Sequence, residues 1–416
     1  MEQLELSESE LQNLVKEYGT TFYIYDGNKI RRNGEIFMKT FKSVLPKFKQ
    51  YYAVKALPNP FILQILADVG MGFDCSSPLE IILAKRFTDD IIYTSNYTSI
   101  TDLIFALENN VLINLDSIDG LYNLIEAVKL SKINMPESIC FRYNPCVLID
   151  SDCLDIGGCT SKFGIGLNNL VKAYKLAIDL GIKKFGIHIM IGSNVLDYEY
   201  WDMIIDKLFE AMKSICFINN MKFDFINLGG GIGINYFPTD KKMDLNNLAN
   251  TINTSLQKYS KIYDIDCENI YMESGRYITG PYGWFISVCK SIKETEDIVF
   301  YGLDTTICNM LRIGIYESSY HHIVVPRLFL EKTLIKSNVV GTLCENNDWF
   351  GKEIMLPVGI KKDDIFVICN AGAHCSAMQS NYNGKLKCSE LMIYNDKIIQ
   401  IRKKQTIEDI LKEYEL

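Results

Sequence analysis

Short apolar segments recur along the first part of the chain, and segments with helical spacing separate them. Helical spacing is clear at residues 61–66 and 79–84. Strands that alternate with helices are typical of a parallel sheet, either an open doubly wound sheet or a closed barrel. Because eight strands close such a barrel, the pattern favours a (β/α)8 TIM barrel of the α/β class. The eight apolar segments lie at residues 50–54, 71–75, 90–94, 111–115, 139–143, 185–190, 223–228 and 268–272.

The pattern changes after Tyr277, where strands follow one another without long helices between them. This arrangement predicts a C-terminal all-β domain that follows the barrel. The expected strands lie at residues 283–291, 297–303, 321–328, 336–343, 364–369, 389–395 and 397–402.

The first residues of the chain predict one helix and one strand. The helix falls within residues 1–20, where Ser7 and Glu10 have the spacing of a capping box. Residues 21–26 have the pattern of a strand and are expected to join the sheet of the β domain. The sequence thus predicts a barrel over residues 28–279 and a β domain made of residues 1–27 and 280–416.

Polar or glycine residues follow every one of the eight apolar segments. Active sites of these barrels lie at the carboxyl ends of the strands, so this placement predicts a site there. The polar and glycine residues at these ends include Lys55, Asp74, Ser77, Thr94, Asn96, Asp116, Ser117, Arg142, Asn144, His188, Ser193, Gly229, Gly231, Glu273 and Arg276.

Lys55 stands at the end of the first apolar segment, and Pro58 and Pro60 end the strand directly after it. An ammonium group there is expected to lose much of its water, which favours the neutral amine. A neutral lysine amine can form a Schiff base. The alternative from this stretch alone is a lysine whose ammonium reaches out to solvent.

Composition narrows the class of protein. The chain is 48% apolar, carries a net charge of −8 and contains no basic block, which argues against nucleic acid as a partner. The N-terminus is acidic and no apolar run reaches ~18 residues, so we expect a cytoplasmic protein without a membrane partner. The thirteen cysteines are scattered, which favours reduced thiols. Four histidines and no CxxC pair give a metal site little support.

Two further motifs carry chemistry. The glycine run 229–233 follows a strand and offers backbone N–H groups to an anion, although a plain tight turn fits the run equally well. Glu273 at the last strand end needs a cationic partner, which is either Arg276 or a protonated ring nitrogen. A reactive lysine, an anion cradle and an acid for a ring nitrogen are together what pyridoxal 5′-phosphate requires.

The motifs resemble the fold-type III pyridoxal-phosphate-dependent decarboxylases of basic amino acids, most of all diaminopimelate decarboxylase. In the β domain, Cys344, Glu345 and Asp348 resemble the Cys-Glu-x-x-Asp element of that family, and Gly372-Ala373-His374 resembles its Gly-Ala-Tyr loop. The barrel motifs that match are Tyr52-Ala53-Val54-Lys55-Ala56, Gly72-Phe73-Asp74-Cys75-Ser76-Ser77, Gly229-Gly230-Gly231 and Glu273-Ser274-Gly275-Arg276.

The resemblance implies a role for each matching residue. Lys55 and Cys344 would be catalytic, with Cys344 reaching the site of the other subunit in a homodimer and protonating the carbon that loses CO2. The cofactor-binding residues would be Lys55, Asp74, His188, Ser193, Gly230, Gly231, Glu273, Gly275, Arg276 and His374. The substrate-binding residues would be Arg276, Arg312, Tyr316, Glu345 and His374.

Substrate identity depends on the far end of the site. Arg312 and Tyr316 resemble the diaminopimelate branch, and a guanidinium suits a distal carboxylate. The implied reaction is decarboxylation of meso-diaminopimelate to L-lysine and CO2 in lysine biosynthesis. The chain departs from the family at two positions: Met190 replaces the histidine that stacks on the cofactor ring, and His374 replaces the tyrosine of the Gly-Ala-Tyr loop.

Other functions remain open at this point. The chain could decarboxylate ornithine, lysine or a carrier-bound amino acid. A catalytically silent regulatory homologue is disfavoured because Lys55, Glu273 and Cys344 are all retained. A racemase of the same barrel type would not need Cys344 and Glu345.

Overall fold

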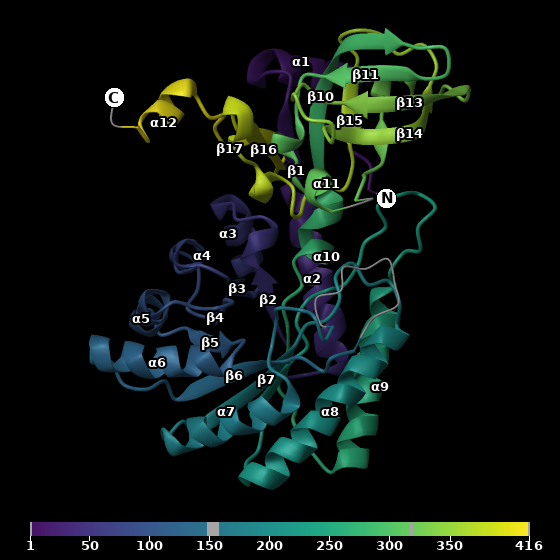
Figure 1. Cartoon of the computed structure of the whole chain (residues 1–416). Helices are drawn as coiled ribbons and strands as arrows, with labels where there is room; N and C mark the ends of the chain where they lie inside the picture. Colours follow the sequence, from purple (N-terminus) through teal and green to yellow (C-terminus); the bar gives the residue numbers. More distant parts are fainter. Residues whose placement is uncertain (1, 148–157, 317–318, 415–416) are drawn as a thin grey trace. The chain divides into compact units, whose positions relative to one another are not determined.

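The computed structural model describes residues 2–147, 158–316 and 319–414 (Figure 1). It divides into two compact units. One consists of Arg31–Ile234 and Lys241–Ile278 and is called the barrel unit below. The other consists of Met1–Ile30, Asn235–Asp240 and Thr279–Leu416 and is called the β unit. The assignment of Asn235–Asp240 to the β unit has no local signal in the sequence.

The barrel unit is built around a closed sheet of eight parallel strands, as the pattern of apolar segments predicted. The strands pair in sequence order, and β9 pairs with β2 to close the ring. The strands are β2 (Lys49–Ala53), β3 (Gly72–Cys75), β4 (Ile91–Thr94), β5 (Leu112–Leu115), β6 (Ser138–Tyr143), β7 (Lys184–Ile189), β8 (Phe225–Asn227) and β9 (Ile270–Met272).

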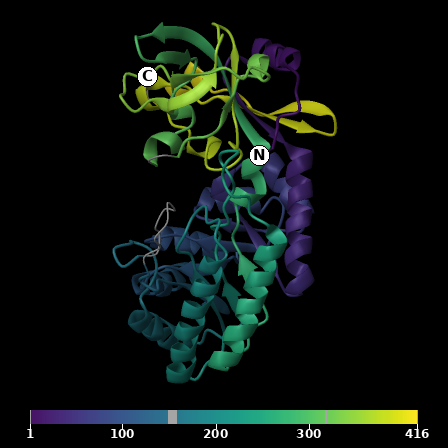
Figure 2. The same cartoon turned by 90° about the vertical axis from the view of Figure 1, so that its right-hand side faces the viewer.

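Two helices of the barrel unit, α4 and α6, begin close behind the preceding strands at serine residues that cap them. Ser77 accepts the backbone N–H of Glu80, and Ser117 accepts that of Gly120, so both serines at strand ends start helices. The long helices α8 and α9 pack against each other, as Figures 1 and 2 show. The helices are α2 (Gly27–Val44), α3 (Pro60–Asp68), α4 (Pro78–Ala84), α5 (Ile100–Glu108), α6 (Ile118–Ser131), α7 (Leu167–Asp179), α8 (Glu199–Asn219) and α9 (Leu245–Tyr263), with the short α10 (Arg276–Thr279) after β9.

The β unit holds a mixed sheet, and the N-terminal strand joins it as expected. Strand β1 (Phe22–Asp26) lies between β10 (Gly283–Glu294) and β16 (Ser389–Tyr394). The order continues from β10 through β11 (Val299–Leu303) and β13 (Leu334–Val340) to β14 (Trp349–Pro357), and from β16 to β17 (Lys397–Arg402). Strand β15 (Ile365–Ile368) pairs with both β10 and β12 (Ile323–Val324).

Two expectations for the β unit are corrected. The strand expected at 321–328 is only Ile323–Val324, because Pro326 begins a 3-10 turn directly after it. Strand β14 (Trp349–Pro357) was not predicted. The unit also contains the short helices α11 (Arg312–Ile315) and α12 (Ile407–Leu411).

Helix α1 (Glu8–Tyr18) has the capping box that the sequence indicated. The Ser7 side chain accepts the N–H of Glu10, and the Glu10 carboxylate accepts the N–H of Ser7. Leu11 and Leu14 of this helix are buried in the apolar cluster that contains Trp284 and the inner residues of β1 and β10. The helix therefore covers one face of the sheet.

One pair of cysteines departs from the expectation of reduced thiols. Cys146 and Cys159 form a disulfide within the connection from β6 to α7, where their Cα atoms lie 4.3 Å apart. The other described cysteines are free thiols, and most are buried. The scatter of cysteines along the chain gave no signal for this pairing.

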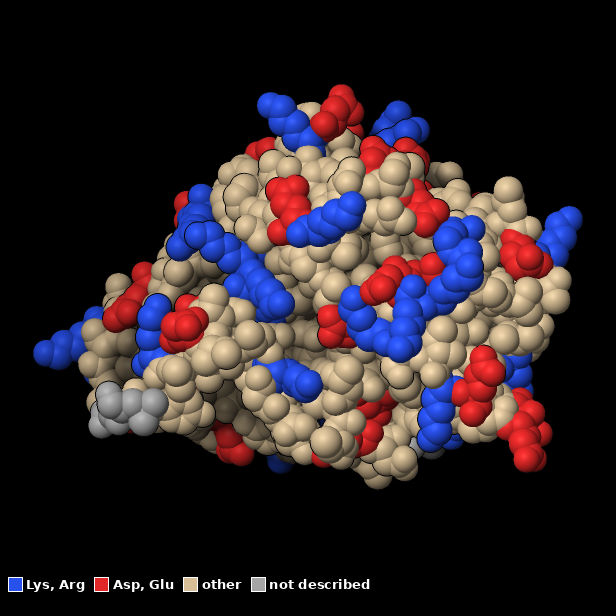
Figure 3. Space-filling model, turned by 90° about the horizontal axis from the view of Figure 1, so that it is seen from above, with Lys and Arg blue, Asp and Glu red and all other residues tan. Residues whose placement is uncertain are grey.

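Charged side chains of both signs lie on the face of the molecule seen in Figure 3. On the face shown in Figure 3, Lys and Arg side chains are interspersed with Asp and Glu side chains rather than gathered into a basic area. Within the described residues, no helix combines the length and the apolar character needed to cross a membrane.

Gly186 tests the packing of the barrel. A methyl group at this position of β7 would overlap the Phe225 ring on β8, which is stacked on Tyr271 with ring centroids 4.6 Å apart. We predict that Gly186→Ala lowers the free energy of unfolding by about 1–3 kcal/mol. Lys184→Ala, at an exposed position of the same strand, should change it by less than about 0.5 kcal/mol. Urea denaturation of both variants measures the difference, and an unchanged Gly186→Ala midpoint would contradict the prediction.

Candidate active site

The carboxyl ends of the barrel strands bring together the residues that the sequence selected in this unit. Lys55 follows β2, Asp74 lies on β3, His188 on β7 and Glu273 directly after β9. Three of these residues are close enough to interact electrostatically, since His188 and Lys55 both lower the pKa of Glu273. The site is therefore formed by strands that are far apart in the sequence.

Lys55 lies in a 3-10 turn, Val54–Ala56, rather than at the last position of the strand. Asn59 then caps α3 by accepting the N–H of Phe61 at 3.1 Å, so the chain turns away at once. The Lys55 side chain is exposed, so the expectation that burial would dehydrate its ammonium is wrong. A Cβ at Gly275 would lie 2.8 Å from that of Ala56, so the glycine lets the end of β9 approach the lysine turn closely.

Glu273 is a buried carboxylate with partners on both oxygens. Asn227 donates to Oε1 at 2.6 Å, and His188 Nε2 lies 3.3 Å from Oε2. Burial alone would raise its pKa, but His188, Lys55 and the Asn227 hydrogen bond outweigh burial and lower the pKa of Glu273 to about 2. The Glu273 carboxylate is thus an anion at neutral pH and can pair with a cationic group.

The orientation of the His188 ring is fixed by a contact at Nδ1. Asn114 Nδ2 lies 3.0 Å from His188 Nδ1, and His188 Nε2 lies 3.3 Å from Glu273 Oε2. Asn114 and Asn227 are both buried on barrel strands and were not selected from the sequence. A single asparagine within a short apolar segment was the only signal that could have found them.

Asp74 has the opposite electrostatic setting. It is fully buried, and neither carboxylate oxygen has a hydrogen-bond partner of good geometry among the described residues. Burial raises the pKa of Asp74 well above its ordinary value, and the charge of Glu273 raises it further, against the opposing effect of Lys55. Buried carboxyl oxygens without well-aligned protein partners are expected where a bound group supplies partners.

The glycine run forms a close-packed cradle. Gly229 and Gly231 have φ values of +65° and +96°, and Gly229 donates its N–H to Asn227 Oδ1 at 2.9 Å. A Cβ at Gly231 would lie 2.6 Å from Gly192 O, and one at Gly230 would lie 2.7 Å from Glu273 O. Only glycine fits these positions, and their backbone can approach an anion without a side chain between them.

Met190 occupies a place next to this cradle. Its Sδ accepts the Gly230 N–H at 3.2 Å, and its backbone oxygen accepts Arg142 Nη2 at 2.7 Å. Burial lowers the pKa of Arg142 to about 10. Arg142 is one of the polar residues at the predicted strand ends, but the sequence indicated no role for it. In the structure its hydrogen bond fixes the backbone at Met190.

Ser193 and Arg276 meet on the same side. Arg276 Nη2 donates to Ser193 Oγ at 3.2 Å, and Arg276 is buried. A hydroxyl and a guanidinium next to this glycine backbone form a set of donors that suits a phosphate. Together with the Lys55 amine and the Glu273 anion, these residues fit pyridoxal 5′-phosphate, whose aldehyde, ring nitrogen and phosphate need those three kinds of partner.

The remaining predicted site residues lie in the β unit. Cys344 and Glu345 are exposed in the turn after β13, and Tyr382 donates a hydrogen bond to Glu345. Asp348 is buried below them, where Oδ1 and Oδ2 accept the N–H groups of Ile307 and Leu343, each at 2.7 Å. The aspartate of this motif therefore shapes the turn that presents the cysteine.

Arg312, Tyr316 and His374 complete the set from the β unit. Arg312 is buried on α11, and Tyr316, half-buried, ends that helix. His374 is half-buried and has a φ of +56°, a left-handed conformation that non-glycine residues seldom adopt. Such backbone strain is concentrated at functional sites.

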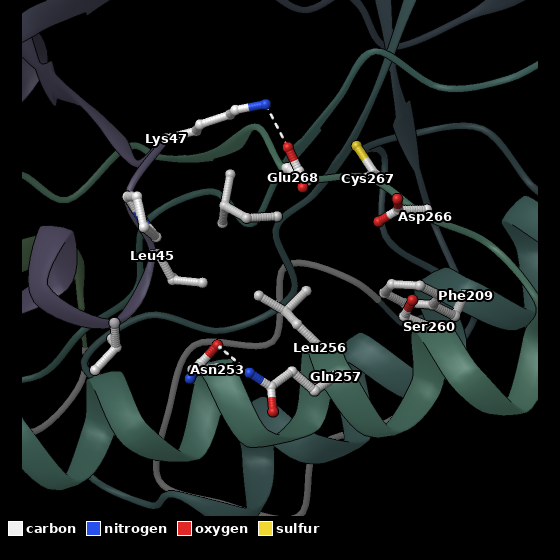
Figure 4. A pocket seen from close by; sticks show the side chains of 13 residues that line it. Leu45, Lys47, Phe209, Asn253, Leu256, Gln257, Ser260, Asp266, Cys267 and Glu268 are labelled. Atoms are coloured by element: carbon white, nitrogen blue, oxygen red, sulfur yellow. Dashed lines mark hydrogen bonds and ion pairs between the residues drawn. The ribbon is translucent and has the colours of Figure 1, made fainter.

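A cavity of about 380 Å³ in the barrel unit is lined by none of the predicted site residues. The cavity lies near the amino-terminal ends of β2 and β9. Lys47 and Glu268, which form an ion pair, are among its lining residues (Figure 4). Burial raises the pKa of its Cys267 thiol to about 12, so this thiol is not a nucleophile at neutral pH. Barrel active sites lie at the other end of the strands, so this cavity is not the candidate site.

The fold and the site define a barrel protein whose strand ends present an amine, a donor cradle and a buried anion. The model of the pyridoxal-dependent decarboxylase family, pyridoxal binding domain, matches residues 31–280. The chain belongs to this family, whose cofactor is pyridoxal phosphate.

Relatives span nearly the whole chain. A diaminopimelate decarboxylase of Methanothermobacter thermautotrophicus is 34% identical over 96% of this chain and 92% of its own length. Protein TabA of Pseudomonas amygdali pv. tabaci is 35% identical over the same shares. The crystal structure of diaminopimelate decarboxylase from Helicobacter pylori complexed with L-lysine has a TM-score of 0.85 and 28% identity, and the match covers 97% of this chain and 98% of that one.

The charge on Glu273 yields a prediction about pH. Its folded-state pKa is about 2 and its ordinary value 4.5, so the stability that its ionised form contributes is present above about pH 4.5 and is lost as pH falls through about 2. We predict that Glu273→Gln is destabilised relative to the unchanged protein at pH 6, and that the difference shrinks between pH 4.5 and 2.5. Urea midpoints across this range measure it.

Glu108→Gln provides the control, because Glu108 is an exposed carboxyl on α5. Its difference from the unchanged protein should stay small over the same range. A Glu273→Gln difference that grows as pH falls would contradict the assignment of an anionic Glu273.

Proposed function

We propose that the chain catalyses the pyridoxal-phosphate-dependent decarboxylation of meso-diaminopimelate to L-lysine and CO2. The observation that carries the proposal is the nearly full-length similarity to proteins named diaminopimelate decarboxylase, including one complexed with L-lysine. Arg312 is the feature of this chain that fits the substrate, because a buried guanidinium suits a carboxylate at the far end of a diamino acid.

Each barrel residue has a part in the proposed reaction. The Lys55 amine would hold the cofactor covalently through its aldehyde carbon, with release of one water molecule. Ser193, Gly230, Gly231, Gly275 and Arg276 hold its phosphate through N–H and O–H donors. Bound pyridoxal phosphate supplies an electron sink for the bond to the departing CO2. Glu273 keeps a proton on the ring nitrogen because its carboxylate is anionic at neutral pH.

The residues around the ring orient it. His188 and Asn227 fix the direction of the Glu273 carboxylate. Met190 would pack a polarisable thioether against the ring in place of an imidazole. Asp74 is buried and, in its neutral form, could donate a hydrogen bond from its carboxyl O–H to the cofactor. His374 would contact the cofactor and the substrate.

Cys344 of a second copy of the chain would supply the proton for the carbon that loses CO2. The exposed turn that Asp348 shapes supports this role, because a thiol that must enter another subunit has to project from the surface. Glu345, Tyr316 and Arg276 meet the amine and carboxylate groups of the substrate. In this proposal the protein is a cytoplasmic homodimer with shared active sites.

Two observations keep a second substrate class under test. Protein TabA, whose name states no reaction, is as similar as the first decarboxylase. Met190 and His374 also change the surroundings of the ring. The alternative is decarboxylation of ornithine, lysine or a carrier-bound amino acid. A silent regulatory homologue has less support because Lys55, Glu273 and Cys344 are present.

The specificity prediction concerns Arg312. Release of CO2 should be fastest from meso-diaminopimelate in a panel that also contains ornithine, lysine and arginine. Arg312→Ala removes one partner of a buried charge pair, which costs on the order of 2–5 kcal/mol. This corresponds to a loss of roughly thirty-fold to several thousand-fold in kcat/KM for meso-diaminopimelate. Any activity on lysine, which carries no second carboxylate, should change little.

Arg312→Lys is the matched variant, and it should rescue poorly because an ammonium cannot present a planar fork. Equal losses on both substrates, together with a lower melting temperature, would show that Arg312 is structural. A preference of the unchanged protein for ornithine would refute the proposed substrate.

The shared site predicts complementation between two inactive proteins. Lys55→Ala lacks the cofactor lysine and Cys344→Ala lacks the proton donor. Mixing them with subunit exchange should restore about one quarter of the wild-type activity, because half of the dimers are mixed and each has one intact site. Activity that stays absent after exchange is verified by mass spectrometry would show that each site is built from one chain.

A further inference from the structure

His321 stands next to Arg312 in the β unit because of a strand pairing. Strands β12 and β15 are antiparallel, with Ile323 opposite Ile368, and Cys369 donates its N–H to His322 O at 2.9 Å. This pairing sets His321 beside the end of β15. His321 and Arg312 are both buried, with 3% and 6% of their surface exposed.

The two ring nitrogens of His321 have different partners. Nδ1 lies 2.7 Å from Cys369 O, and Arg312 Nε lies 3.3 Å from Nε2. A carbonyl oxygen only accepts and a guanidinium nitrogen only donates, so Nδ1 carries the proton and Nε2 accepts. Both contacts are satisfied only by the neutral ring with its proton on Nδ1.

Tyr236 fixes the plane of the same guanidinium. Its ring lies 4.8 Å from Arg312 Cζ and meets the His321 ring edge to face, with centroids 4.7 Å apart. Asp240 holds the turn that carries Tyr236, because its Oδ2 accepts the N–H groups of Tyr236 and Phe237. The guanidinium is thus held at its Nε and over its face.

We propose that His321 is a positioning residue that sets the orientation of Arg312 for the distal carboxylate of the ligand. A guanidinium whose Nε is bonded to a fixed acceptor keeps its plane before the ligand arrives, so less conformational freedom is lost on binding. His321 does not touch the ligand; it acts through Arg312. This inference rests on the proposed function, since it takes Arg312 as the carboxylate partner.

The competing role for His321 is purely structural. The Nδ1 contact ties the segment before β12 to the end of β15, and this tie alone could explain a buried histidine. The two roles use different ring nitrogens. They can therefore be separated by side chains that keep only one of them.

His321→Gln and His321→Asn form the matched pair. A glutamine carbonyl reaches the place of Nε2 and can accept from Arg312, but it gives up the Nδ1 donor. An asparagine amide reaches the place of Nδ1 and can donate to Cys369 O, but it gives up the acceptor. His322→Asn is the control, because His322 neighbours His321 in the chain and its contact with β15 is through its backbone oxygen.

The measurement is ligand binding to the cofactor-loaded protein by calorimetry. L-lysine and 1,5-diaminopentane differ by one carboxylate. The dissociation constant of 1,5-diaminopentane divided by that of L-lysine therefore reports recognition of that group. We expect the ratio in His321→Asn to fall by about tenfold or more, as for the loss of a hydrogen bond to a charged group. We expect His321→Gln and His322→Asn to keep the ratio of the unchanged protein.

The outcomes separate the inference from the proposed function. If the unchanged protein binds both ligands equally and releases no CO2 from meso-diaminopimelate, the proposed function fails and the inference fails with it. If the unchanged protein prefers L-lysine but His321→Asn keeps the ratio, or His321→Gln loses it, only the inference is overturned. Should His321→Asn not fold, His321→Leu, which has no acceptor, replaces it, with the same expected fall in the ratio.

Discussion

The site depends on the pairing of the first barrel strand with the last. Only Lys49 with Tyr271 and Gln50 with Met272 form this pairing, and Gln50 strengthens it by donating to Ser274 O at 2.9 Å. The closure brings the lysine turn and the end of β9 together, although more than two hundred residues separate them. Without it, Lys55 and Glu273 would have no common surroundings.

Two buried carboxyl groups behave differently in that setting. Glu273 is surrounded by donors and a histidine, and its pKa is lowered to about 2. Asp74 has no comparable partners, and its pKa is raised well above its ordinary value. Because a second buried charge beside Glu273 would be repelled, the anionic form of one acid favours the neutral form of the other. The barrel thereby presents two carboxyl groups with different roles: Glu273 as a hydrogen-bond acceptor and Asp74 as a potential donor.

The sequence predicted the barrel well because parallel strands buried on both faces are continuous apolar runs. It predicted the strand-end residues because topology alone places those ends together. It did not predict β14, whose residues Trp349–Pro357 mix glycine, charged and apolar side chains without a clear period. It also missed Asn114 and Asn227, since a lone asparagine in a strand has no local pattern. Lys55 is exposed, and not buried as the sequence led us to expect, because the strand ends two residues earlier and a turn follows.

The segment Asn235–Asp240 lies in the sequence between two parts of the barrel but is compact with the β unit. The polypeptide therefore passes from one unit to the other four times: after Ile30, Ile234, Asp240 and Ile278. Neither unit corresponds to one uninterrupted stretch of gene. A recombination event that exchanged the C-terminal half for that of a relative would leave Tyr236 facing foreign neighbours. The β unit and the barrel are thus constrained to be inherited together, and new specificity is expected to arise by point substitution rather than by exchange of modules.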